Sequence, residues 1–399
     1  MINRPDYIAA IEPFIDKPLV KILAGIRRCG KSTIFEMLRE ELLRRGIGED
    51  QIVCKRYTEM DIPENITAKQ MYDELTAAMA GKGHCYLLLD EIQEITGWEK
   101  AVNSLLERAD ADIYVTGSNS KLMSSEISTY LTGRYVSIPV YTLSFKEYLD
   151  FKADSTLSRR ELLEEYIRFG GFPIIALSEY DEQSAYQIVN GIYHTVVSRD
   201  IVKRHRINKQ DLFDRVVKYI IENMGKTFSA NSISTFLKSE HRKVSVESIY
   251  NYLRWLEQAF IIYPCERYDL QGKSILKTQE KYYLADVSLK YALLGYNRKM
   301  LDGAMENIVY LELKRRGYDV YIGKNDTKEI DFVATRRDER IYVQVCVRIP
   351  EASDREVGNL MEIRDHYPKY VVTLNEMDIG IENGIRIVHL ADFLIAEAW

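Results

Sequence analysis

The sequence predicts an α/β fold divided into several domains. Short apolar runs at residues 19–24, 86–89 and 112–116 read as buried strands that end in polar or glycine-rich turns, with helical patterns between them. This alternation is typical of a parallel sheet covered by helices. At 399 residues the chain is too long for one ordinary core. We therefore expect two or three domains, the first of which contains the parallel sheet.

The composition is that of a folded chain, with 46% hydrophobic and 29% charged residues. A formal net charge of -6 gives no overall attraction to nucleic acid, so binding of that kind needs a local basic face. Five scattered cysteines without CxxC spacing disfavour a zinc site and a disulfide framework. No apolar run approaches the ~20 residues that a bilayer span needs. We expect a soluble, cytoplasmic protein without membrane contact.

The first chemical motif is the loop GIRRCGKS at residues 25–32, which fits GxxxxGK[ST]. Glycines let successive backbone N–H groups point at phosphate oxygens, and the helix that begins at Lys31 directs its positive end at the same group. Lys31 would reach the β- and γ-phosphates, and the Ser32 hydroxyl would hold Mg²⁺. The predicted nucleotide-binding residues are Gly25, Arg27, Arg28, Cys29, Gly30, Lys31, Ser32 and Thr33.

A pair of acids follows the second predicted strand. Asp90 is placed to bind the water shell of Mg²⁺, and Glu91 to orient or deprotonate the attacking water. Two solvated acids at a strand end are the alternative, but the upstream phosphate loop favours the catalytic interpretation. We therefore expect Asp90 at the metal and Glu91 in catalysis.

Polar residues also follow the third predicted strand. In a parallel sheet this turn lies at the same edge as the phosphate loop, so Ser118 or Asn119 could contact the γ-phosphate or the attacking water. Both residue types are equally good N-caps of the segment that follows. Arg134 is a candidate for the additional positive charge of phosphoryl transfer, with a surface ion pair as the alternative.

Five segments together resemble the AAA-type ATPases that are widespread in bacteria and archaea and whose C-terminal half was long classed as a domain of unknown function. They are GIRRCGKST, LLLDEIQEITGWE, VTGSNSKLM, LTGRYVSIPVYTLSFKEYL and FGGFPIIAL. The resemblance covers nearly the whole chain and implies an additional-strand P-loop fold with ATP and Mg²⁺. It implies Walker roles for Lys31, Ser32, Asp90 and Glu91, a sensor role for Asn119, and an arginine role for Arg134 in cis or across a subunit interface. Because such relatives often assemble, a homo-oligomer is also implied.

The middle of the chain is predicted to be helical. Residues 141–209 hold short amphipathic segments interrupted by GGFP, which we interpret as a helical lid. Residues 210–279 give three short helices and a strand-like run, the pattern of a winged helix-turn-helix. Arg242, Lys243, Ser248, Asn251 and Arg254 lie at or in its third helix and are types that contact phosphates or base edges. Double-stranded DNA is the expected partner; a protein partner is the alternative.

Residues 280–399 resemble a PD-(D/E)xK nuclease core, a helix followed by strands. Glu306 and Asp331 match the first two acidic positions, but Gln344 and Cys346 stand where the glutamate and lysine belong. The neutral Gln344 removes one metal ligand, and Cys346 removes the cation that stabilises the attacking hydroxide. Glu329 cannot replace that lysine. We expect a nuclease-like site that has lost cleavage.

The predicted fold class is thus α/β: an AAA-type P-loop domain at 1–140, a helical lid at 141–209, a winged helix at 210–279 and a restriction-endonuclease-like domain at 280–399. The expected function is Mg²⁺-dependent ATP hydrolysis that drives a conformational switch in a DNA-associated C-terminal module. One alternative is an ATP-regulated DNA nuclease. Another is an ATP-dependent protein-binding switch without DNA contact.

Overall fold

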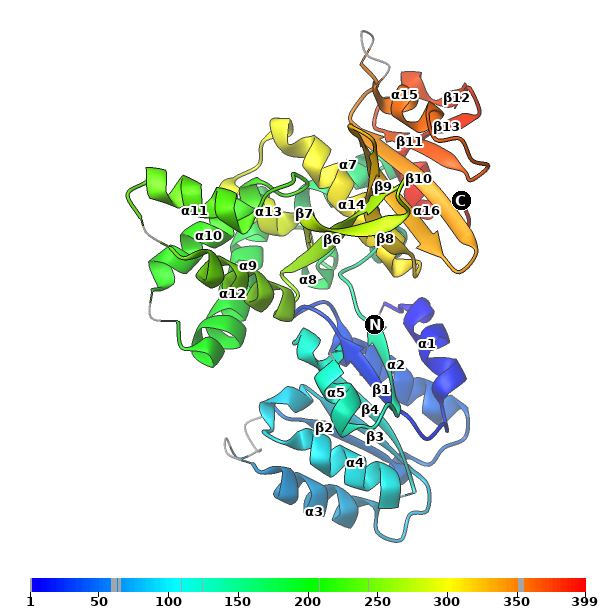
Figure 1. Ribbon diagram of the computed structural model, residues 1–399. Coiled ribbons are helices and arrows are strands. Elements are labelled where there is room, and N and C mark those ends of the chain that lie inside the picture. The colour runs from blue at the N-terminus through cyan, green and yellow to red at the C-terminus, as the bar shows by residue number, and fades with distance from the viewer. Residues whose placement is uncertain are drawn as a thin grey trace. The chain divides into compact units, whose positions relative to one another are not determined.

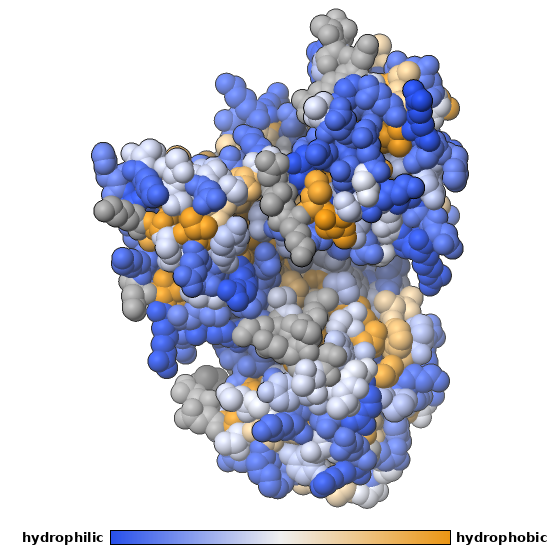
Figure 2. Space-filling view, in the orientation of Figure 1, coloured by the Kyte–Doolittle hydropathy of each residue, from blue (hydrophilic) through white to orange (hydrophobic). Residues whose placement is uncertain are grey.

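The computed structural model describes residues 2–58, 63, 66–108, 110–123, 125–207, 209–242, 244–350 and 355–399. The chain divides into two compact units. The first is Met1–Tyr141 with the short segment Gln258–Phe260, and the second is Thr142–Glu257 with Ile261–Trp399. None of the helices in the described ranges combines the length and apolar character that a bilayer crossing requires. The face drawn in Figure 2 is mostly hydrophilic, with small separate apolar patches, as is usual for a folded chain.

The first unit alternates strands with helices (Figure 1). Its strands are β1 (Val20–Ala24), β2 (Ile52–Arg56), β3 (Cys85–Asp90), β4 (Ala111–Gly117) and β5 (Tyr135–Pro139). Its helices are α1 (Pro5–Ile11), α2 (Lys31–Arg44), α3 (Ala68–Met79), α4 (Trp98–Arg108) and α5 (Ser125–Tyr130).

All strand pairs of this unit are parallel, in the order β2-β3-β4-β1-β5. Strand β4 therefore lies between β1 and β3, which is the additional-strand arrangement that the resemblance implied. The register pairs Ala24 with Gly117 and Leu89 with Val115. Because parallel strands end at the same edge, the segments after β1, β3 and β4 meet there.

Helices cover both faces of this sheet. The crossover through α2 runs from β1 outward to the edge strand β2, whereas α3 and α4 lead back toward β1. Right-handed crossovers in opposite directions place their helices on opposite faces. Helix α4 packs against both α3 and α5, as this rule requires (Figure 1). Covered on both faces, strands such as β1 and β3 are buried along their whole length.

The second unit joins helices to an eight-stranded sheet. Its helices are α6 (Phe145–Phe151), α7 (Arg159–Phe169), α8 (Pro173–Ala176), α9 (Glu182–Thr195), α10 (Gln210–Glu222), α11 (Ala230–Ser239), α12 (Val246–Gln258), α13 (Ser288–Leu294), α14 (Leu301–Arg315), α15 (Arg355–Met361) and α16 (Leu390–Ile395). Its strands are β6 (Ile262–Asp269), β7 (Ser274–Leu284), β8 (Asp319–Asn325), β9 (Lys328–Arg336), β10 (Glu339–Cys346), β11 (Lys369–Thr373), β12 (Gly380–Glu382) and β13 (Ile385–His389).

The strands after α12 belong to the C-terminal sheet. Strands β6 and β7 form an antiparallel pair, and β6 also pairs in parallel with β8 in the sheet order β12-β13-β11-β10-β9-β8-β6-β7. The hairpin thus extends the C-terminal sheet (Figure 1). The boundary predicted between residues 279 and 280 falls inside β7, because ladder hydrogen bonds hold this strand in one sheet on both sides of it. The winged helix stays a prediction that rests on α10, α11 and α12.

Candidate nucleotide-binding site

The loop between β1 and α2 has a backbone that only certain residues can adopt. A Cβ atom on Gly25 would lie 1.9 Å from the Val140 carbonyl oxygen, so only glycine fits there. Gly30 caps α2 with φ of 102°, and Arg28 has φ of 67°. These left-handed positions curl the loop in the way that the phosphate-binding interpretation requires.

The side chain of Arg4, a residue not predicted from the sequence, supports the backbone of this loop. Arg4 is 2% exposed and donates from Nη1 to the Cys29 carbonyl oxygen (2.7 Å) and from Nη2 to the Tyr141 carbonyl oxygen (3.0 Å). Its guanidinium also lies 4.5 Å from the Tyr7 ring centroid. A single arginine ahead of a short helix carries no spacing signal that predicts such contacts. Arg4 therefore acts as a positioning residue for the loop.

Lys31 and Glu91 face each other across the loop. The Lys31 ammonium is within 3.0 Å of the Gly25 carbonyl oxygen and 3.6 Å of Glu91 Oε1. Glu91 has the left-handed φ of 56°, and its backbone N–H donates to Thr116 Oγ1 (3.0 Å). The surrounding structure must compensate for the strain of a non-glycine residue in this conformation, and the bond to Thr116 is one such contact.

Asp90 connects the loop helix to the sheet. Its Oδ2 accepts from Ser32 Oγ (2.7 Å) and Arg56 Nε (3.1 Å), and its Oδ1 accepts from Thr116 Oγ1. A serine hydroxyl beside a carboxylate supplies the hard oxygen ligands that Mg²⁺ prefers. The residues present therefore fit the metal: Ser32 would ligate it and Asp90 would hold its water shell. Bound there, Mg²⁺ would neutralise negative charge on the phosphates.

Glu91 is kept ionised although it is largely buried. Burial alone would raise the pKa of its carboxyl group, but the nearby charges of Lys31 and Arg27 and hydrogen bonds from Gln93 and Ser118 lower the pKa below its usual value. Ser118 Oγ lies 3.1 Å from Glu91 Oε2, and Gln93 Nε2 donates to the same oxygen. Gln93, two residues beyond Glu91, is not among the residues predicted from the sequence.

The remaining predicted residues differ in their surroundings. Asn119 directly follows Ser118 and is 3% exposed. Its sensor role stays a prediction. Arg27 Nη2 lies 3.5 Å from Glu94 Oε1, and Arg28 points to solvent. Cys29 is fully buried, which raises the pKa of its thiol, and Thr33 is half-buried in α2. For Arg27, Arg28 and Cys29 only the backbone N–H groups are expected at the phosphates.

Arg134 lies at the end of the sheet where β1 begins, whereas the phosphate-binding loop follows the other end of β1. Its carbonyl oxygen accepts from the backbone N–H of Val20 (3.0 Å), where β1 begins. The length of β1 separates this point from Gly25, about 16 Å at about 3.3 Å per residue. Its guanidinium contacts Asn103 Oδ1 and Glu107 Oε1, each at 2.8 Å. Of the two roles left open for Arg134, this placement disfavours the one in cis; the role across a subunit interface stays a prediction.

Comparison with known proteins bears on this geometry. Residues 17–149 match the family model of an AAA domain, and residues 160–299 match a domain of unknown function, DUF8612. An uncharacterized protein of Haemophilus influenzae is 36% identical over 398 residues, 99% of each chain. An uncharacterized protein of Methanocaldococcus jannaschii is 32% identical over 354 residues, 85% of this chain and 77% of the other. The chain belongs to this family of AAA-domain proteins.

A solved structure supports the fold of this AAA-domain protein. The Walker-type ATPase PABY2304 of Pyrococcus abyssi has a TM-score of 0.51 at 15% identity, over 73% of this chain and 96% of the other. The AAA-type P-loop domain expected from the motifs is thus confirmed. The match at residues 160–299 carries no assigned activity, so the winged-helix and nuclease-like interpretations remain predictions.

The predicted DNA-contacting residues lie at or on α12. Tyr250 is 57% exposed, and Arg254 Nη2 donates to Asn251 Oδ1 (2.6 Å) on the same exposed face. Ser248 is half-buried and shares a hydrogen bond with the Ser245 hydroxyl (2.8 Å). Arg242 forms an exposed ion pair with Asp211 of α10. Lys243 lies outside the described residues.

The acids Glu306 and Glu329 contact a lysine, Lys281, that was not predicted from the sequence. Lys281 of β7 is 4% exposed, and its Nζ lies 2.9 Å from Glu329 Oε1 and 3.3 Å from Glu306 Oε2. Tyr283 Oη donates to the same Glu306 oxygen (3.1 Å). We name Glu306, Glu329, Asp331 and Lys281 the carboxylate cluster. Lys281 precedes the helix and strands of the nuclease motif in the sequence, so only the tertiary structure places it here.

The carboxylate cluster does not fit a divalent metal. Asp331 Oδ2 accepts from the Val345 backbone N–H (2.8 Å), and Gln344 Oε1 accepts from the Asp331 backbone N–H (3.2 Å). Burial and the neighbouring Glu306 raise the pKa of Asp331 well above its usual value. Burial would lower the pKa of Lys281, but Glu306, Asp331 and Glu329 raise it. An ammonium group, not an open metal position, therefore lies among these acids.

Substitution of Arg4 tests its positioning role. Arg4→Ala leaves two buried carbonyl groups without their donor and creates a cavity, so we expect the free energy of unfolding of the first unit to fall by about 3 kcal/mol. Urea unfolding followed by circular dichroism measures this. Arg39→Ala removes an exposed arginine whose ion pair with Glu49 is worth at most about 1 kcal/mol. Equal losses in the two variants would contradict the role.

Proposed function

We propose that the protein binds ATP with Mg²⁺ and hydrolyses it, and that the nucleotide state sets the conformation of the C-terminal unit. The observation that carries this proposal is the convergence of Lys31, Ser32, Asp90 and Glu91 at one edge of the sheet. The AAA-domain match and the Walker-type fold support it.

Each group has a defined task in this proposal. The Lys31 ammonium, now within 3.2 Å of the Ile26 carbonyl oxygen, exchanges neutral carbonyl partners for phosphate oxygens when ATP binds. Glu91 accepts a proton or a hydrogen bond from the attacking water, because its lowered pKa keeps it ionised near neutral pH. Ser118 and Gln93 orient the Glu91 carboxylate. Arg134 contributes only if a second copy of the chain brings it to the γ-phosphate.

Two variants separate binding from hydrolysis. Lys31→Ala removes the cation at the phosphates, so we expect both ATP affinity and turnover to fall, turnover by at least ~100-fold. Glu91→Gln keeps the shape of the side chain but not its basicity, so ATP affinity should persist while turnover falls by ~100-fold or more. Steady-state phosphate release and equilibrium ATP binding measure the two quantities.

Lys69→Ala is the matched control, since Lys69 is an exposed lysine of the same unit that pairs with Asp73. Its turnover should equal that of the wild type. Wild-type turnover in Lys31→Ala would refute ATP hydrolysis at this loop.

We propose that the exposed face of α12 contacts double-stranded DNA. Tyr250, Asn251 and Arg254 share this face, and asparagine and arginine are the types that read adenine and guanine in the major groove. The Arg242 pair with Asp211 is exposed and therefore weak, so a DNA phosphate can compete for this arginine. The alternative is a protein partner on the same face.

Arg254→Ala distinguishes these partners. For a duplex contact we expect about tenfold weaker binding of duplex DNA, because a good base contact is worth about 1–3 kcal/mol. Fluorescence anisotropy with a labelled duplex measures the affinity, and the ATPase rate with and without duplex measures the coupling. Binding of the duplex that is equal in wild type and Arg254→Ala would favour the protein partner.

We propose that the carboxylate cluster does not cleave nucleic acid. Lys281 supplies the positive charge that a metal would bring. Asp331 is buried, and its carboxylate accepts a hydrogen bond from the Val345 backbone N–H. An ATP-regulated nuclease remains the second candidate, because Glu306 and Asp331 retain two acidic positions of such a site.

Removal of the Lys281 side chain tests whether its ammonium group takes the place of a metal ion in the carboxylate cluster. Lys281→Ala leaves buried acids without a cation, so we expect about 3 kcal/mol of destabilisation. Mg²⁺ or Mn²⁺ should restore part of this loss in the variant and change the wild type little; thermal unfolding with and without metal measures both. Lys328→Ala, which removes an exposed pair with Glu362, is the control. DNA cutting by the wild type that disappears in Asp331→Ala would refute this proposal.

A further inference from the structure

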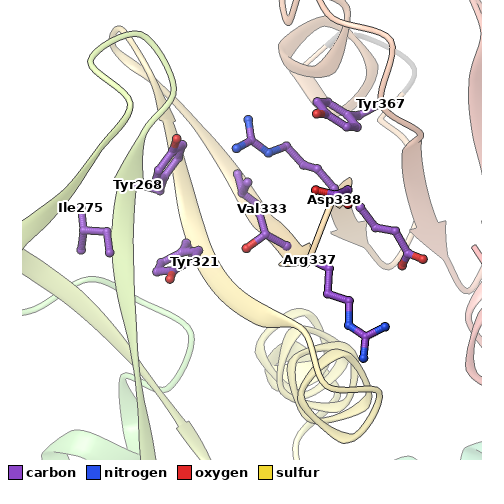
Figure 3. Close-up of a pocket in the computed structure, with 10 residues that line it drawn as sticks. Tyr268, Ile275, Tyr321, Val333, Arg337, Asp338 and Tyr367 are labelled. Carbon is purple, nitrogen blue, oxygen red and sulfur yellow. The ribbon is translucent and has the colours of Figure 1, made fainter.

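A groove of about 440 Å³ opens on the second unit, beside the turn that joins β9 to β10 (Figure 3). We name it the tyrosine groove and define it by Tyr268, Tyr321, Tyr367, Arg337, Asp338 and Arg340. These residues come from β6, β8, the β9–β10 hairpin and the segment before β11. They belong neither to the nucleotide site nor to the carboxylate cluster.

Aromatic rings form two walls of the tyrosine groove. The rings of Tyr268 and Tyr321 lie on neighbouring strands, with centroids 5.8 Å apart, and Tyr367 lies on the opposite side (Figure 3). All three rings are partly exposed and pack against the core cluster of Ile330, Val333, Tyr342, Cys346, Val357, Leu360, Val371, Ile385 and Ile387. The packed base holds the rings in place, and the His366 ring stacks on that of Tyr367 with centroids 4.6 Å apart. The remaining exposed surface of the three rings is available for contact with a ligand.

Arg340 joins the two walls. Its guanidinium lies 5.5 Å from the Tyr268 ring centroid and 5.4 Å from that of Tyr367, and its Nη1 is 3.5 Å from the Tyr342 hydroxyl oxygen. These are cation–π distances, and a guanidinium plane can also stack on a base. In the described ranges, no carboxylate forms an ion pair with Arg340.

The charge balance of the groove favours an anionic ligand. Arg337, at the hairpin turn, likewise forms no ion pair with any acid that the structure describes. Glu339 is already engaged, because Arg336 Nη2 lies 2.7 Å from its Oε2 and Tyr318 Oη donates to the same oxygen (3.1 Å). Asp338 is exposed at the turn and offsets one of the two arginines. Among the six residues that define the groove, two arginines therefore face one acid, while Asp319 and Glu266 act on Tyr321 from outside this set.

We propose that the tyrosine groove binds single-stranded nucleic acid. Unpaired bases stack on Tyr268, Tyr321 and Tyr367, and the backbone phosphates pair with Arg337 and Arg340. Aromatic platforms combined with arginines are the usual chemistry of single-strand recognition, whereas the bases of a duplex are stacked on one another and do not present their faces. The proposal is independent of ATP hydrolysis and of duplex contact by α12.

Fluorescence anisotropy of the full chain with a labelled oligothymidine of about 12 nucleotides tests this proposal. Loss of one stacking ring costs about 1–3 kcal/mol, so Tyr268→Ala should bind at least fivefold more weakly, whereas Tyr268→Phe keeps the ring and should bind as the wild type does. Arg337→Ala should weaken binding and reduce the slope of log affinity against log salt by about 0.7, one phosphate contact. Lys146→Ala, an exposed lysine of α6, is the matched charge control.

Three results would overturn the proposal. The first is oligothymidine affinity that is the same in Tyr268→Ala, Arg337→Ala and wild type. The second is preference for a duplex of equal length that survives in Arg254→Ala. The third is complete displacement of the labelled oligothymidine by free thymidine monophosphate at concentrations similar to those at which the oligothymidine itself binds. That result would identify a mononucleotide site. ATP turnover measured in the same variants separates these outcomes from failure of the nucleotide site.

Discussion

The Asp90 carboxylate is the interaction on which the first unit's site depends. It receives hydrogen bonds from Ser32 at the start of α2, Arg56 at the end of β2 and Thr116 in β4. A buried carboxylate is costly unless such donors surround it. Because Asp90 ends β3, these bonds lock the phosphate-binding loop to three strands at once. The position of Glu91 follows directly, since it is the next residue and is held by the same threonine.

The two acidic centres of the protein use similar residues in opposite ways. At the nucleotide site Lys31 contacts carbonyl oxygens and lies 3.6 Å from one glutamate, so its charge is available for phosphate. In the carboxylate cluster Lys281 lies within 3.3 Å of two glutamates and is neutralised internally. Buried charges are stable only when paired, and the partner decides what they can do. One centre is open to an anionic ligand, and the other is self-contained.

Strand β7 connects the features of the second unit. It carries Ile275 beside the tyrosine groove, Lys281 in the carboxylate cluster and Tyr283, whose ring stacks on Tyr310 of α14 at 4.5 Å. Its partner β6 begins at Ile262, shortly after α12 ends at Gln258, so the helix proposed for DNA leads directly into this hairpin. A shift of α12 would therefore act on the sheet through backbone hydrogen bonds, which are stiff.

The sequence by itself determined the phosphate loop, the two acids of β3 and the AAA-type sheet, because local spacing and strand–turn–helix order specify them. It also predicted the helices α10 to α12 and the acids Glu306 and Asp331. Only the tertiary structure decided the roles of Arg4, Gln93 and Lys281, the placement of Arg134 at the far edge, and the union of β6 and β7 with the C-terminal sheet. Each of these depends on contacts between residues distant in the chain or on side-chain geometry, which spacing along a sequence does not encode.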